Sequence, residues 1–129
     1  MSKSILSTNL QREILTAIDF VKESVTWRPN RDQVHLEKRV RLGHLPSGTT
    51  LADYNSIIQL IVNDENATIY LFQFDNISYP VVVTTDKEQV WLVMFGMNGI
   101  METAFPPDKP DKYFRDSRYQ LIGELKDII

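Results

Sequence analysis

The side chains best suited to phosphate chemistry gather in one short segment, residues 31–41. At helical spacing this segment places Arg31, His35, Lys38 and Arg39 on one face. An imidazole, with an ordinary pKa of about 6.5, can take or give a proton at neutral pH. Lysine and arginine can hold phosphate oxygens and stabilise their negative charge. A solvated basic face on a surface helix shows the same pattern, so the segment alone leaves both interpretations open.

Three further candidates for the same site lie outside that segment. Thr103 belongs to a predicted strand, and its hydroxyl could bind a phosphate oxygen opposite the basic helix. We expect Met101, Thr103 and Phe105 to share one face of that strand. Tyr113 and Arg115 follow a proline-rich turn and could add a hydroxyl and a cation. Each also has a structural interpretation, because threonine favours strands and an aromatic residue after a turn can anchor a helix.

Composition excludes several other kinds of site. The chain has no cysteine, which excludes disulfides, zinc–thiolate sites and thiol nucleophiles. His35 and His44 show no metal-binding spacing, so we expect no metal site. We expect no cofactor, and neither a glycine-rich phosphate loop nor a dinucleotide fingerprint is present. The net charge of −3 argues against non-specific coating of nucleic acid, although basic residues crowd the region 28–41.

Length and hydrophobicity indicate a single domain. The 129 residues, of which 43% are hydrophobic, can bury a core of useful size, so we assign residues 1–129 to one domain. The first residues lack an apolar stretch of secretory length, and no later stretch is long enough to span a membrane. We therefore expect a soluble, cytoplasmic protein without a membrane partner.

The pattern of apolar residues predicts an α+β fold in which helices come before strands. The first helix is expected over residues 9–24 with a cap at Thr8, the second over the basic segment as far as Gly43, and the third from Thr50. Runs of β-branched and aromatic residues then predict four strands, over residues 68–74, 77–84, 89–95 and 100–105.

These strands are expected to form a four-stranded antiparallel meander, with the N-terminal helices packed on one face. Two tight links support this prediction. They are Asp75-Asn76 and, as the stronger signal, Asn98-Gly99, which readily adopts the positive φ angles of a type I′ turn. After the proline-rich turn, residues 113–129 are expected to form a closing C-terminal helix.

The order of these motifs resembles a known group of proteins. The run His35-Leu-Glu-Lys38-Arg39 follows a first helix, a later helix contains Asp53-Tyr54, and residues 91–107 and Tyr113-Phe114 come after it. This combination is similar to the toxin nucleases of the barnase, EndoU, colicin and RelE-like (BECR) fold, and most of all to their bacterial contact-dependent and polymorphic toxin branches. The resemblance covers residues 33–114.

The resemblance implies a metal-independent endoribonuclease that cleaves RNA, often tRNA, in a bacterial cell. Such toxins are neutralised by a tightly binding immunity or antitoxin protein, and they can enter a target cell as part of a larger toxin. Motif by motif, His35 and Lys38 match the histidine and lysine of the family's H-x-x-K-H pattern. Thr103 matches its strand Ser/Thr, and Tyr113 matches the aromatic residue that follows. These four residues are the catalytic candidates.

The chain departs from the family at Arg39, where many members have a second histidine. This departure leaves the second proton-transfer group open. We expect Arg31, Arg39 and Arg115 to bind the RNA substrate.

A function of a different class is a non-catalytic protein-binding module, such as an immunity or antitoxin-like protein. Its support is the acidic net charge and the missing second histidine, because a protein that holds polyanionic RNA usually carries more positive charge. Growth arrest on expression in bacteria would favour the toxin, and unimpaired growth would favour the binding module.

Overall fold

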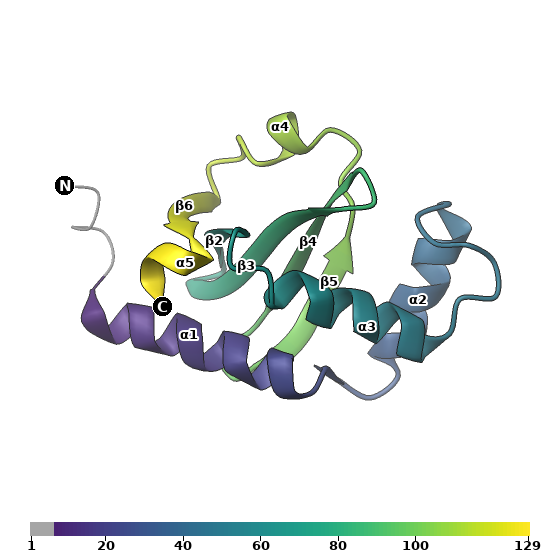
Figure 1. The fold of residues 1–129 in the computed structure, drawn as a ribbon, viewed down its shortest axis with the longest axis horizontal. Helices are drawn as coiled ribbons and strands as arrows, with labels where there is room; N and C mark the ends of the chain where they lie inside the picture. The colour runs from purple at the N-terminus through teal and green to yellow at the C-terminus, as the bar shows by residue number, and fades with distance from the viewer. Residues whose placement is uncertain (1–6) are drawn as a thin grey trace.

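The computed structural model describes residues 7–129 as a six-stranded mixed sheet with its main helices on one face (Figure 1). The helices are α1 (Thr8–Glu23), α2 (Arg31–Arg41), α3 (Leu51–Val62), α4 (Pro110–Tyr113) and α5 (Leu125–Ile128). The strands are β1 (Thr26–Trp27), β2 (Thr68–Phe74), β3 (Ile77–Asp86), β4 (Gln89–Phe95), β5 (Ile100–Phe105) and β6 (Tyr119–Glu124). The α+β class is thus confirmed.

The sheet has the strand order β1-β5-β4-β3-β2-β6. The four expected strands are β2 to β5, each pairing antiparallel with the next along the chain. Two strands that the sequence did not predict extend the sheet at its edges. β1 pairs parallel with β5, and β6 pairs antiparallel with β2, so the expectation of a four-stranded sheet is wrong.

The expected C-terminal helix over residues 113–129 is also wrong. The short helix α4 ends at Tyr113, where the expected helix would begin, and β6 and the short helix α5 follow it. The apolar residues there recur at a spacing that fits a helix, but β2 would otherwise leave an unpaired edge. β6 satisfies that edge and places the Tyr119 ring in an aromatic cluster on the sheet.

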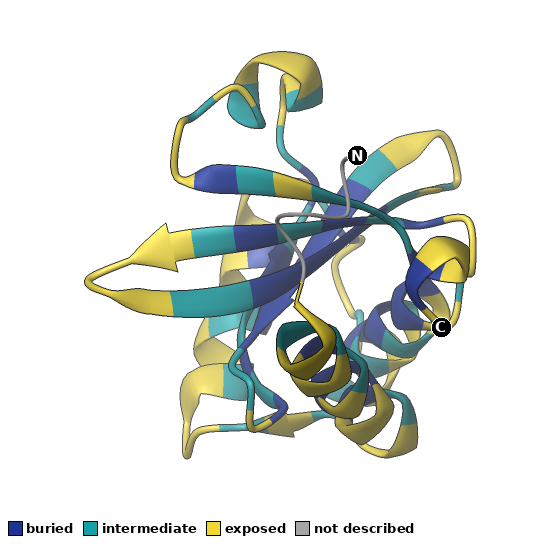
Figure 2. Ribbon diagram, turned by 90° about the vertical axis from the view of Figure 1, so that its left-hand side faces the viewer, coloured by how far each residue is buried: buried dark blue, intermediate teal, exposed yellow. Residues whose placement is uncertain are grey.

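Both faces of the sheet bury apolar side chains, because successive strand residues point to opposite sides. One face packs against α1 and α3, with fully buried residues such as Ile14, Ile58, Trp91 and Phe95. The other face carries a smaller cluster under the α4 segment, built from Val81, Val83, Leu92, Met94 and Tyr119 and flanked by partly buried aromatic rings. Buried positions accordingly run along the middle of the sheet and the inner sides of the helices (Figure 2).

Local capping largely follows the sequence. Thr50 and Asp53 form a reciprocal capping box at the start of α3, as the sequence predicts. At α1 the cap is Ser7 rather than Thr8, because the Ser7 hydroxyl accepts from the Leu10 amide. Within residues 7–129, no helix has the length and apolar character needed to cross a bilayer.

The two predicted hairpin links behave differently. Asp75 and Asn76 both have positive φ, as a type I′ turn requires. At Asn98-Gly99 only the glycine does, because the connection between β4 and β5 is longer than two residues and closes with a bond from the Gly99 amide to the Gly96 carbonyl. The type I′ prediction there is therefore wrong.

Candidate functional site

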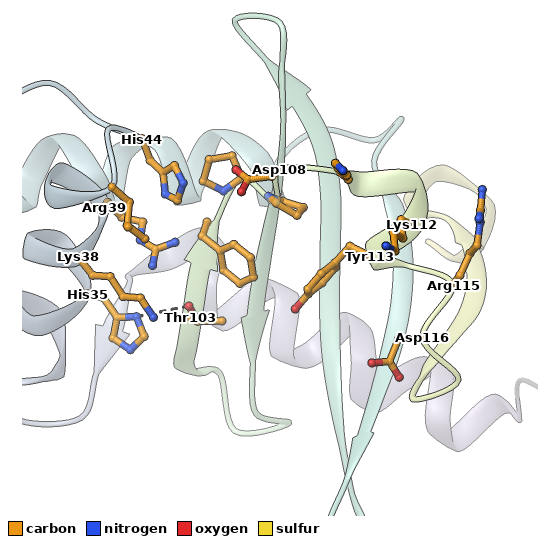
Figure 3. Close-up of a pocket in the computed structure, with 15 residues that line it drawn as sticks. His35, Lys38, Arg39, His44, Thr103, Asp108, Lys112, Tyr113, Arg115 and Asp116 are labelled. Carbon is orange, nitrogen blue, oxygen red and sulfur yellow. Dashed lines mark hydrogen bonds between the residues drawn. The ribbon is translucent and has the colours of Figure 1, made fainter.

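A cavity of about 1050 Å³ opens between α2, the end of β5 and the α4 segment (Figure 3). α2 contributes His35, Lys38 and Arg39 to its lining, and β5 contributes Thr103 and Phe105. The opposite wall comes from the α4 segment and includes further cations. These are Lys109, Lys112 and Arg115. The cavity is thus bordered by cations on two sides, and the carboxylates of Asp108 and Asp116 also line it.

A bulge in β5 sets the position of Thr103. Along the β4–β5 ladder Met94 pairs with Thr103 but Phe95 pairs with Met101, which makes Glu102 the extra residue. Met101 therefore packs into the core beneath the helices, while Phe105 joins the cluster on the other face. The expectation that Met101, Thr103 and Phe105 share one face is wrong because the bulge shifts the alternation.

The Thr103 hydroxyl meets the His35 imidazole across the edge of the sheet. Their Oγ1 and Nδ1 atoms are 3.4 Å apart (Figure 3). On its other side, the His35 Nε2 atom is 3.4 Å from a guanidinium nitrogen of Arg31. Arginine can only donate, so Nε2 accepts and the neutral ring carries its proton on Nδ1. The lone pair of Nε2 is then the basic position of this imidazole.

The surroundings of His35 keep its imidazole neutral. Its ring lies 5.1 Å from the Trp27 ring, which β1 positions and which donates a hydrogen bond to Asn55. Burial, followed by the charges of Arg31, Arg39 and Lys38, lowers the pKa of His35 to about 4. At neutral pH the imidazole can therefore accept a proton.

Arg39 is buried although it carries a charge. Only 3% of its surface is exposed, and the guanidinium carbon lies 5.2 Å from the centre of the Phe105 ring. Within residues 7–129 no carboxylate forms an ion pair with it, and its Nε atom has no hydrogen-bond partner. Lys38, one residue earlier, is exposed and also lines the cavity.

His44 is a site residue that the sequence analysis considered only as a metal ligand. The Gly43 amide bonds to the Val40 carbonyl and the His44 amide to the Arg39 carbonyl, a Schellman motif in which Gly43 has φ 78°. This turn folds His44 back over the last turn of α2 and into the cavity lining. A glycine directly after a helical segment was the available signal, since it predicts this reversal.

Of the remaining candidates, two line the cavity and one lies outside it. Tyr113 lines the cavity, and its hydroxyl accepts a hydrogen bond of 3.0 Å from the Tyr119 hydroxyl. Arg115 also borders the cavity, but Figure 3 shows its guanidinium directed away from His35 and Thr103. Arg31 lies outside the cavity lining and reaches the site only through His35.

The arrangement provides a neutral base, a hydroxyl and several cations around one open cavity. Within the part of the chain that the structure describes, no group of three or more histidine, cysteine, aspartate or glutamate side chains could hold a metal ion. The polar groups that are present suit proton transfer and the binding of anionic oxygens.

Comparison with protein-family models, with curated proteins and with solved structures finds no match to this chain. The case for a function therefore depends on the geometry of the cavity and on the motif resemblance.

Proposed function

We propose that the protein is a metal-independent endoribonuclease toxin that cleaves RNA, with tRNA as the substrate class that the BECR resemblance implies. The observation that carries this proposal is the contact between His35 and Thr103 at the edge of a cation-lined cavity. The motif assigned the two residues to one site although 68 positions separate them in the chain. A solvated basic face would not bring a half-buried histidine against a strand hydroxyl.

The proposed reaction uses the ribose itself as nucleophile. His35 takes the proton of a 2′-hydroxyl through Nε2, which exchanges its 3.4 Å contact with Arg31 for the substrate hydroxyl, and the 2′ oxygen attacks the adjacent phosphorus. Lys38 and Thr103 hold the phosphate oxygens while negative charge develops on them. The bond from phosphorus to the 5′ oxygen breaks, leaving a 2′,3′-cyclic phosphate and a 5′-hydroxyl.

Tyr113 is our candidate donor of the proton to the departing 5′ oxygen. Its hydroxyl oxygen accepts from Tyr119, so its own proton stays available to a group in the cavity. A neutralising immunity or antitoxin protein belongs to the same proposal, since the resemblance implies one.

The direct test is incubation of the purified protein with total tRNA in EDTA. Cleavage in the absence of free divalent metal, with products that end in a 2′,3′-cyclic phosphate, is the expected result. A matched sample with added magnesium should give the same products. Intact tRNA under both conditions would contradict the proposal and would favour the protein-binding module.

The pH dependence of kcat/KM tests the state of the proposed base. Because His35 acts as a neutral imidazole with a pKa of about 4, kcat/KM should not fall as the pH passes the ordinary value of 6.5. It should fall only as the pH drops through about 4, where the ring becomes protonated. Circular dichroism at each pH controls for unfolding. An inflection at 6.5 would show that the catalytic imidazole lacks the environment described above.

A further inference from the structure

The Arg39 guanidinium is a buried cation that forms no ion pair with the described residues. Its Nε atom has no hydrogen-bond partner, and its guanidinium carbon lies over the Phe105 ring, 5.2 Å from the ring centre. Burying an arginine without a carboxylate is costly, and a protein that retains one usually supplies an anion from elsewhere. The guanidinium borders the cavity, so a bound ligand could supply that anion.

His44 presents a second polar atom without a partner at the same end of the cavity. Its Nδ1 atom is buried and has no hydrogen-bond partner. The Schellman motif fixes its backbone to the Arg39 carbonyl, so the two residues are held together by main-chain hydrogen bonds. In the view of Figure 3, the Arg39 guanidinium lies between the imidazoles of His44 and His35.

We infer that Arg39 and His44 form a phosphate-binding subsite that holds the RNA phosphate next to the one that is cleaved. The inference deepens the proposed function and depends on it for the identity of the ligand as RNA. An oxyanion would accept hydrogen bonds from the guanidinium and from the N–H group that the neutral His44 imidazole carries. Lys38, which lines the same cavity, adds positive charge to this region.

The spacing along α2 separates this subsite from the cleavage position. Arg39 follows His35 by four residues, which is about one helical turn, or about 5.4 Å along the axis. This rise is comparable to the separation of successive phosphates in a single RNA strand. One phosphate can therefore occupy the position beside His35 and Thr103 while its neighbour lies against Arg39 and His44.

Inorganic phosphate is the probe for a binding experiment that does not depend on RNA cleavage. The chain has two histidines, so their imidazole NMR signals can be assigned with the variants H35N and H44N. Titration with phosphate should shift the His44 signals in the wild type. In Arg39→Met the affinity for phosphate, measured from the same signals, should fall by about 10- to 100-fold, which is the effect of losing hydrogen bonds to a charged group.

Arg41→Met is the matched control, because Arg41 is an exposed arginine in the last turn of the same helix and outside the cavity lining. It should respond to phosphate like the wild type. The inference is overturned if the His44 signals do not respond to phosphate in the wild type, or if Arg39→Met responds as the wild type does. Should Arg39→Met fail to fold, a smaller rise of Tm with phosphate in H44N than in the wild type supports the subsite, and an equal rise overturns it.

Substrate length separates the subsite from the proposed function. A trinucleotide with two phosphates should have a lower KM than a dinucleotide with one, and Arg39→Met should remove that advantage. If the wild type binds phosphate at His44 but leaves RNA intact, the proposed function fails and the anion site stands. If RNA is cleaved while the His44 signals ignore phosphate, only the subsite fails.

Discussion

Replacing His35 by asparagine is expected to slow RNA cleavage by about 10²–10⁴-fold, the usual contribution of a general base. Asparagine places an amide donor near the position of Nδ1, so it can keep the contact with Thr103 that the imidazole makes. It removes Nε2, the atom assigned to proton abstraction. The loss should appear mainly in kcat, because the cations that hold the phosphate are unchanged.

Glu37→Gln is the control for this variant, since Glu37 is an exposed residue of α2 outside the cavity lining. It should cleave RNA at the wild-type rate. Thermal unfolding of both variants then shows whether the fold is retained. Wild-type cleavage by a folded H35N protein would remove His35 from the mechanism and with it the main support for the ribonuclease.

The part of the site that could be predicted from sequence depends on local signals. Arg31, His35 and Lys38 share a helix whose periodicity and terminal glycine are visible in the chain, and the second helix ends where the sequence predicts. Thr103 could be assigned to a strand, but its face could not, because a bulge at Glu102 leaves no local mark in a single sequence. The side of the sheet that Thr103 faces follows from that bulge.

The remaining errors have a common physical cause, which is that pairing partners distant in sequence decide the structure. Residues 119–124 have apolar positions that fit either a helix or a strand, and the free edge of β2 selects the strand. The burial of Arg39 could not be predicted from the sequence either, since it depends on Phe105 from β5 and on the chain reversal at Gly43. A basic run in one helix therefore contains both an exposed lysine and a buried arginine.

The burial of Arg39 affects the stability of the fold. The folded environment disfavours a charged guanidinium, and desolvation by burial is the largest cause of the lowered pKa of Arg39. A buried donor without a partner costs about 1–3 kcal/mol, and more when it is charged. The stacking of Arg39 on Phe105 offsets about 0.5–2 kcal/mol of this cost. Because the cost is larger for a charged donor than for a neutral one, we expect the charge to be destabilising in the absence of an anion.

Arg39→Met is therefore expected to raise the free energy of unfolding by about 1–2 kcal/mol in buffer without phosphate or sulfate. Methionine keeps an unbranched apolar stem and a sulfur that can contact the Phe105 ring, so little packing is lost. Urea denaturation of Arg39→Met, Arg41→Met and the wild type measures the difference, with Arg41→Met expected to match the wild type.

Phosphate should make the wild type more stable than Arg39→Met. A ligand that binds only the folded state at about 100 times its Kd adds about 2.7 kcal/mol to the stability of the wild type. Phosphate should stabilise the Arg39→Met protein much less, because its subsite is weakened. A variant that is less stable than the wild type even without phosphate would show that Arg39 supports the fold rather than a ligand. The expected crossing, in which the wild type is less stable when empty and more stable when phosphate is bound, identifies Arg39 as a residue retained for an anion that the chain itself does not provide.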